Sequence, residues 1–144
     1  MSATFFEATA TTVGVELGSE RREDRALVVR HRVFTDIVRC QDDRVAGVNR
    51  PDMDLDIDTD TMCGPVSGRF VLRPDRVDGH WEGEVKGDLK GGVVTACGLG
   101  SGRGALAGAP IRVDFQQVEK LDDPPETDDP LAFYTMSGMI VSPP

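Results

Sequence analysis

The segment DMDLDIDTDT, residues 52–61, has an aspartate at every even position and Met, Leu, Ile or Thr at every odd position. This period of two is that of a β-strand with one solvated and one apolar face. An EF-hand calcium loop would require Gly in place of Ile57 and Glu in place of Cys63, so that alternative fails. We therefore expect the aspartates to face solvent, and Met53 and Leu55 to face a core.

Similar strand-like segments recur along the whole chain. Sixteen Gly and nine Pro separate short stretches that are rich in β-branched residues, without the 3.6-residue period of a helix. Turns are expected at residues 18–24 and 41–52. Strands are expected at residues 4–17, 26–40, 52–61, 66–74, 80–87, 91–100, 111–120 and 131–144.

Eight short strands with hairpin-length connections predict an antiparallel meander. Closure into a barrel would remove the exposed strand edges. We therefore predict an all-β fold, with a single eight-stranded antiparallel β-barrel domain over residues 1–144. An eight-stranded barrel is either filled by side chains or holds one small ligand, so any function is expected inside the barrel or at its mouth.

The composition excludes several classes of function. A net charge of −9 and a sequence pI of about 4.6 argue against nucleic acid or an anionic membrane as a partner. Three well-separated cysteines indicate neither a zinc cluster nor a disulfide framework, and no metal site is expected. The N-terminal segment has no signal-peptide pattern, and no apolar run is long enough to span a membrane. These features predict a cytoplasmic protein.

The alternation of side chains assigns an inner face to most predicted strands. In residues 26–40 the odd positions are the more apolar, which predicts that His31 and Thr35 point inward; on residues 80–87, Trp81 is the expected inner residue. Strand 131–144 is apolar on both faces and its inner face stays open. The residues predicted to line the lumen and bind substrate are Thr35, Met53, Leu55, Phe70, Leu72, Cys97, Phe115 and Gln117.

Strand 131–144 also bears on assembly. A strand that is apolar on both faces often has its outer side covered by a partner subunit. Phe133, Met139 and Val141 therefore predict a homo-oligomer, either a dimer or a trimer.

Three local patterns resemble those of a known family. They lie in the segments QDDRVAGVN, SGRFVLRPDRVDGHWEGEVKG and GLGSGRGALAGAPIRV, followed near the end by SGMIV. The first pattern is an Asp-Arg-x-x-Gly turn at Asp43, Arg44 and Gly47. The second is a Gly-x-Trp-x-Gly strand at Gly79, Trp81 and Gly83. The third is a glycine-rich turn with Gly100, Gly102, Gly104 and Gly108.

With these patterns the chain resembles the bacterial branch of the allene oxide cyclase-like barrel proteins, which are relatives in fold of dirigent proteins and calycin-like in architecture. The resemblance implies a barrel without a cofactor whose cavity shapes an unsaturated, apolar or polyene-like substrate for cyclisation or isomerisation in specialised, polyketide-type metabolism. Its motifs are structural, and no catalytic residue of the family has a matching motif in this chain.

Candidate catalytic residues therefore come from the side-chain alternation alone. Holding a flexible substrate in its reactive conformation and donating one or two hydrogen bonds to a carbonyl would suffice for such a cyclase. Trp81 would provide a flat wall and an N–H donor, Tyr134 an O–H donor, and His31 a donor or base near neutral pH. Two alternatives stay open, namely a barrel that binds a small molecule without catalysis and a structural barrel with a filled lumen.

Overall fold

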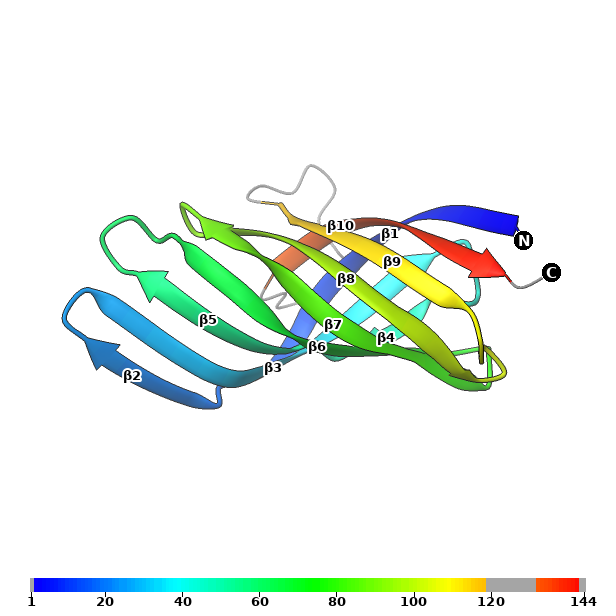
Figure 1. Cartoon of the computed structure of the whole chain (residues 1–144), viewed down its shortest axis with the longest axis horizontal. Helices are drawn as coiled ribbons and strands as arrows, with labels where there is room; N and C mark the ends of the chain where they lie inside the picture. Colours follow the sequence, from blue (N-terminus) through cyan, green and yellow to red (C-terminus); the bar gives the residue numbers. More distant parts are fainter. Residues whose placement is uncertain (1, 119–131, 143–144) are drawn as a thin grey trace.

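The computed structural model of the chain describes residues 2–118 and 132–142. The structure is all-β, and its described residues contain no helix long and apolar enough to cross a membrane. The strands, labelled in Figure 1, are β1 (Ser2–Glu16), β2 (Ser19–Glu23), β3 (Ala26–Cys40), β4 (Gly47–Asn49), β5 (Asp52–Asp58), β6 (Gly64–Pro74), β7 (Gly79–Lys90), β8 (Val93–Gly104), β9 (Pro110–Gln117) and β10 (Ala132–Ser142).

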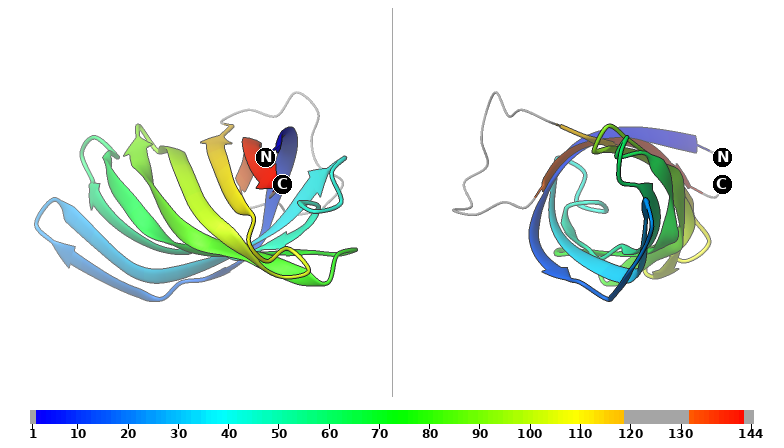
Figure 2. Two further views of the ribbon diagram at one scale, coloured as in Figure 1. Left: turned by 45° about the vertical axis from the view of Figure 1, so that its right-hand side comes forward. Right: turned by 90° about the vertical axis from the view of Figure 1, so that its left-hand side faces the viewer.

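Eight of the strands form a closed antiparallel ring. The ring runs β1, β10, β9, β8, β7, β6, β4 and β3, and it closes because β1 pairs with both β10 and β3. Seen from the end that carries β2, the strands encircle a central axis (Figure 2). The predicted eight-stranded antiparallel β-barrel is therefore confirmed.

Two further strands, β2 and β5, lie outside the ring. The predicted turn at residues 18–24 contains β2, and the predicted turn at 41–52 contains β4. The expectation that these segments are only turns was wrong. The reason is the length of β3, whose first half extends beyond the ring and offers pairing partners to β2 on one side and β5 on the other.

The extension continues the inner face of the barrel past its rim. Leu27 lies opposite Ile57 and Val29 opposite Leu55, on the side of the sheet that faces the lumen. Figure 1 shows β2, β3 and β5 projecting from the ring at the left. The barrel thus has one end that opens onto an apolar, sheet-like platform.

The opposite part of the lumen is packed with side chains. Trp81, Phe70 and Leu72 are at most 2% exposed. The rings of Phe70 and Phe115 lie over Gly98, where an added Cβ would approach the Phe70 ring to 3.1 Å. A glycine at this position therefore lets two aromatic rings fill the narrow barrel.

The two predicted strands near the C-terminus lie only partly within the described residues. Of the predicted strand 111–120, residues 119 and 120 lie outside them, and of the predicted strand 131–144, residues 131, 143 and 144 do.

Candidate functional site

A small cavity lies inside the barrel, toward the end that carries the β3–β5 extension. Its volume is about 60 Å³. Most of its wall is apolar, and two polar side chains, those of Asp36 and Tyr134, interrupt it. The apolar lining consists of Phe34, Pro51, Met53, Leu55, Val66, Val85, Val94, Ala96 and Phe115.

Asp36 is the buried acid of this cavity. It lies on β3, is only 4% exposed, and accepts a hydrogen bond of 2.6 Å from the Thr12 hydroxyl of the neighbouring β1. Burial raises the pKa of Asp36 from its ordinary value of 3.8 to about 6, although the hydrogen bond from Thr12 acts in the opposite direction. The carboxyl therefore changes protonation state close to neutral pH.

Tyr134 provides the second polar group. It lies on β10, where it pairs with Ala10 of β1, and its side chain is half-buried on the cavity wall. Burial raises the pKa of Tyr134 to about 12, and the negative charge of Asp36 adds to the effect. The phenol consequently stays protonated at neutral pH and is available as a hydrogen-bond donor.

Asn49 extends the polar row beside Asp36. It lies directly opposite Asp36 on β4, so both side chains point inward, and it is 1% exposed. Its amide oxygen Oδ1 has no hydrogen-bond partner among the described residues. A buried acceptor without a donor is unfavourable, which makes this row of Thr12, Asp36 and Asn49 chemically unusual for a barrel core.

Asp36 points inward because of an irregularity in β3. Between Val29 and Arg32 the register shifts against β5, and His31 within this β-bulge has a positive φ of 55°. One extra residue in the strand reverses the side-chain alternation that follows it. Odd positions face the lumen before the bulge and even positions face it afterwards, including Phe34 and Asp36.

The bulge corrects two of the sequence predictions. The imidazole of His31 is on the outer surface, where its side chain is 80% exposed and Nδ1 lies 3.3 Å from an Asp52 oxygen. Thr35 follows the reversed alternation and is half-buried on the outer side of β3. The prediction that these two side chains face the lumen was wrong, because the apolar pattern alone does not show where a strand bulges.

Arg32, which the odd-in pattern placed outside, lies opposite Met53 and so faces inward near the mouth. Its guanidinium pairs with Glu20 of β2 and donates a hydrogen bond to the Leu17 carbonyl oxygen. The ion pair places charged groups beside the opening of an otherwise apolar cavity.

Cys97 also lies on the outer face, contrary to prediction. Its partners across the sheet are Lys86 on β7 and Asp114 on β9. Burial is the main reason that the pKa of the Cys97 thiol is raised, with Asp114 adding to the effect. On β8 it is Val94 and Ala96 that line the cavity instead.

The remaining predicted residues all face inward, but not all of them reach the cavity. Met53, Leu55 and Phe115 line it, whereas Phe70 and Leu72 are packed in the core. Trp81 is fully buried, and its indole N–H donates a 2.7 Å hydrogen bond to the Arg44 carbonyl oxygen. Gln117 Oε1 accepts a hydrogen bond from the Val94 backbone N–H. The donor of Trp81 is therefore already satisfied within the fold.

The aspartates on β5 lie on its outer face, as their alternation indicates, but the strand ends at Asp58 rather than at residue 61, and Asp60 lies in the turn that follows. Asp56 pairs with Arg30 at 2.9 Å and Asp60 with Arg25 at 3.1 Å. The part of the chain that the structure describes contains no group of three or more His, Cys, Asp or Glu side chains placed to hold a metal ion.

The sequence patterns did not identify the three polar residues of the barrel interior, Asp36, Thr12 and Asn49. In residues 33–40 both alternations carry large apolar side chains, so the pattern permits either face to be the inner one. A carboxyl between Phe34 and Val38 is the one available signal, because a charged residue within an apolar row is unusual.

Comparisons with known proteins add no identification. No family model matches the chain, and searches of curated proteins and of solved structures found no similar protein. The resemblance to allene oxide cyclase-like barrels stays a prediction, and the class that the fold itself defines is an antiparallel β-barrel with a polar pair in its lumen.

Proposed function

We propose that the barrel binds a largely apolar, unsaturated molecule with its carbonyl group at Asp36 and Tyr134, and that it acts as a cofactor-independent isomerase or cyclase. The observation that carries the proposal is the buried Asp36 carboxyl on the wall of an apolar cavity. Titratable groups with displaced pKa values in such cavities are candidates for proton transfer.

The energetic disadvantage of this carboxyl supports a functional role. The difference between a pKa of 3.8 and one of about 6 corresponds to about 3 kcal/mol against the charged form. An apolar side chain would fill the same position without that penalty. Asp36 weakens the fold at a cavity wall, so we attribute its presence there to function and not to stability.

The cavity volume limits what fits inside it. About 60 Å³ is well below the roughly 300–1,000 Å³ of an ordinary small-molecule site, so the cavity holds a head group and not a whole polyene. The remainder of the substrate would lie along the apolar inner face at the mouth. Leu27, Leu55 and Val94 are half-buried there and provide that surface.

The two polar groups suit a proton shift. As a carboxylate, Asp36 would remove a proton from the carbon next to the substrate carbonyl, while the Tyr134 O–H donates a hydrogen bond to the carbonyl oxygen. The C–H electron pair then forms the enolate double bond. Asp36 would return its proton to the far carbon of the unsaturated system, which moves the double bond without an oxidant, reductant or further reactant.

A filled structural barrel is the second candidate. The small cavity volume favours it, because Trp81, Phe70 and Leu72 already occupy much of the lumen. A third candidate is a barrel that binds a ligand, as an enzyme would, but leaves it chemically unchanged. Ligand binding and turnover distinguish the three functions.

The test uses a β,γ-unsaturated cyclohexenone, whose isomerisation to the conjugated ketone is followed by ultraviolet absorbance. Binding is measured separately by calorimetry. We expect turnover by the native protein, with kcat reduced about 10²–10⁴-fold in Asp36→Asn while binding is retained. The matched control is Asp88→Asn, which removes an exposed carboxyl on β7 and should leave the rate unchanged.

Each other outcome rejects the enzyme proposal in a defined way. Binding without isomerisation would indicate a carrier, and neither binding nor isomerisation would indicate a filled barrel. Equal loss of rate in Asp36→Asn and Asp88→Asn would show that the lumen carboxyl has no special role.

A further inference from the structure

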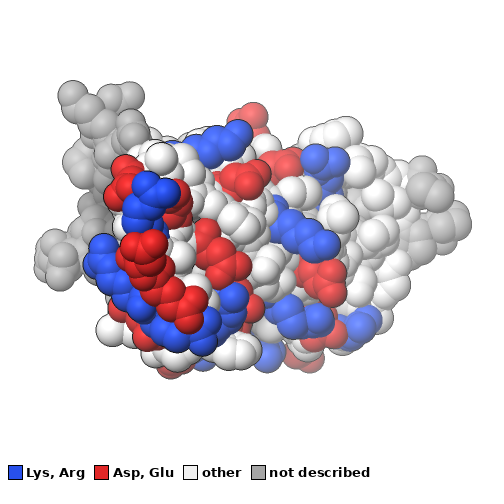
Figure 3. Space-filling model, turned by 60° about the vertical axis from the view of Figure 1, so that its left-hand side comes forward, with Lys and Arg blue, Asp and Glu red and all other residues white. Residues whose placement is uncertain are grey.

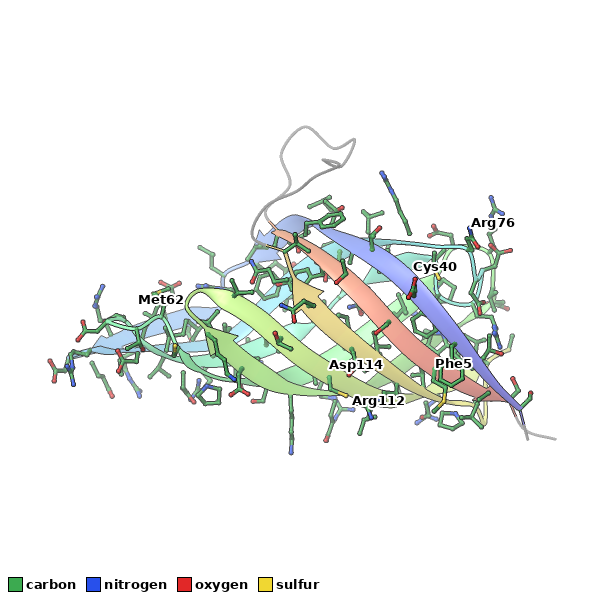
Figure 4. The ribbon with its side chains drawn as sticks, turned by 90° about the horizontal axis from the view of Figure 1, so that it is seen from above. Phe5, Cys40, Met62, Arg76, Arg112 and Asp114 are labelled. Carbon is green, nitrogen blue, oxygen red and sulfur yellow. The ribbon has the colours of Figure 1, made fainter. Side chains whose placement is uncertain are left out.

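A second hollow lies on the outside of the barrel, over β1, β10, β9 and the first part of β8, and residues 39–42 at the end of β3 border it. Its volume is about 1850 Å³, far larger than that of the lumen cavity. Figure 4 looks down on these four strands and labels Phe5 on β1 and Arg112 and Asp114 on β9. The proposed function makes no use of this surface.

Exposed apolar side chains are concentrated in one row, which crosses the hollow on β1, β10 and β9 and ends on β8 beyond the residues that line it. The register places Phe5, Met139, Arg112 and Leu99 next to one another on β1, β10, β9 and β8, and we name these four residues the outer row. Phe5 is 76% exposed and Leu99 is 60% exposed.

Large apolar side chains rarely remain this exposed in a common row, so the outer row has the character of an interface. The other exposed large apolar side chains among the described residues are Val13, Leu17 and Met62, and they lie elsewhere, at a β-bulge and in turns.

The neighbouring row supplies charges that complement the outer row. It consists of Glu7, Ser137, Asp114 and Cys97 on the same four strands, and we name it the second row. Arg112 of the outer row already pairs with Asp114 at 3.3 Å, and the two side chains are 57% and 46% exposed. Both charges are thus accessible to a second molecule.

The charge of this face also suits a second copy of the chain. The chain carries a net charge of −9, but the two rows together contain only Glu7 and Asp114 against Arg112. Acidic residues are numerous at the other end of the molecule, where Figure 3 shows red and blue side chains interleaved around β2, β3 and β5. Two copies can therefore meet through the outer and second rows with little net repulsion.

We propose that a second copy of the chain packs on this face as a symmetric dimer. The two-fold axis runs across the strands, between the outer row and the second row. Arg112 of each copy then lies against Asp114 of the partner subunit, and the sheet of the partner subunit covers Phe5 and Leu99. This is an isologous contact between two sheets, which pack face to face at a separation of about 10 Å.

The first experiment measures association of the full chain by sedimentation equilibrium over a range of concentrations. We expect a monomer–dimer equilibrium that is weakened at least about tenfold by Phe5→Asp and by Leu99→Asp. The matched control is Leu17→Asp, since Leu17 is 63% exposed but lies outside both rows, and its dissociation constant should equal that of the native chain. Circular dichroism and Trp81 fluorescence report whether each variant is folded.

The second experiment tests the position of the axis with substitutions of exposed residues. Arg112→Asp leaves two acids at the contact and Asp114→Arg leaves two bases, so each variant alone should associate more weakly than the native chain. An equimolar mixture of the two variants should associate more strongly than either variant alone, because opposite charges then meet across the axis.

Three results would overturn the proposal. They are a native chain that stays monomeric at all concentrations, an assembly that Phe5→Asp and Leu99→Asp do not weaken, and a mixture of the charge variants that associates no better than its components. A monomer would mean that this face is covered by a different molecule or remains exposed.

Discussion

Replacement of Asp36 by asparagine isolates the energetic effect of the buried carboxylate. Asparagine has nearly the same shape, and its amide oxygen still offers an acceptor to the Thr12 hydroxyl, which donates to Asp36 at 2.6 Å. The variant cannot ionise at this position. Any difference in pH dependence between the two proteins therefore reports on the carboxyl of residue 36.

The sign and size of the effect follow from the displaced pKa. Burial raises the pKa of Asp36 from 3.8 to about 6, so between these values the folded protein holds a proton that the unfolded chain has released. The free energy of unfolding of the native sequence therefore falls as the pH rises through this range. At 1.36 kcal/mol per pKa unit the fall is about 3 kcal/mol.

The free energy of unfolding of Asp36→Asn does not include this fall with pH, because asparagine does not ionise. Relative to the native protein, the variant should become more stable by about 3 kcal/mol between about pH 4 and about pH 7, whatever the offset between them at low pH. The effect is fully developed at about pH 7, where most of the native carboxyl is charged.

Urea unfolding at a series of pH values measures this difference. Trp81 is the only tryptophan of the chain and is fully buried, so its fluorescence reports directly on unfolding of the barrel. The other carboxyl groups titrate in both proteins and cancel in the comparison. Asp88→Asn serves as the control, since it makes the same substitution at an exposed carboxyl on β7.

Parallel profiles for Asp36→Asn and the native protein would show that folding does not raise the pKa of Asp36. Such a result would mean that water reaches the carboxylate and stabilises its charge. The buried carboxylate would then cost the fold nothing, and the proposed function would lose its main support.

Three further predictions concern neighbouring groups. Because burial raises the pKa of Tyr134, the only tyrosine, to about 12, ultraviolet titration of the folded protein should show no phenolate near pH 10; phenolate there would place the ring in water. Asn49→Leu should change the free energy of unfolding by less than about 1 kcal/mol or increase it, because an unpaired buried acceptor is removed; a large loss in urea unfolding would reveal a partner for the amide. Trp81→Phe should lower the free energy of unfolding by about 1–3 kcal/mol, measured by circular dichroism, because the Arg44 carbonyl loses its donor; an unchanged midpoint would show that this hydrogen bond contributes nothing.

The sequence predicted the barrel well because period-two alternation is a local property. On β5, β6 and β9 the alternation is uninterrupted, and Met53, Phe70 and Phe115 all face inward as expected. Closure of the ring depends on pairing between β1 and β10, at opposite ends of the chain. Ring closure could be predicted only from the general rule that an open sheet leaves two exposed edge strands, which closure removes.

The candidate site was harder to predict because it depends on backbone irregularities. A bulge in β3 reverses the alternation after Val29, and a second shift in β1 lies between Thr12 and Gly14, next to the partner of Asp36. His31 adopts the left-handed conformation although it is not a glycine, so no residue type marks the bulge. Identifying Asp36 as a lumen residue requires knowing that a bulge lies between Val29 and Asp36.

The bulge also connects the strain in β3 to the chemistry of the lumen. In a regular strand of the same residues, without the bulge, Thr35 would face inward and Asp36 would face solvent, where a carboxylate is well hydrated. The observed backbone instead accepts an unfavourable φ of 55° at His31, exposes that side chain, and places an acid among apolar residues. Two unfavourable features in one strand, both absent from a regular strand of the same residues, are hard to explain by stability. Both features are expected if the bulge in β3 serves to place the Asp36 carboxyl in the lumen.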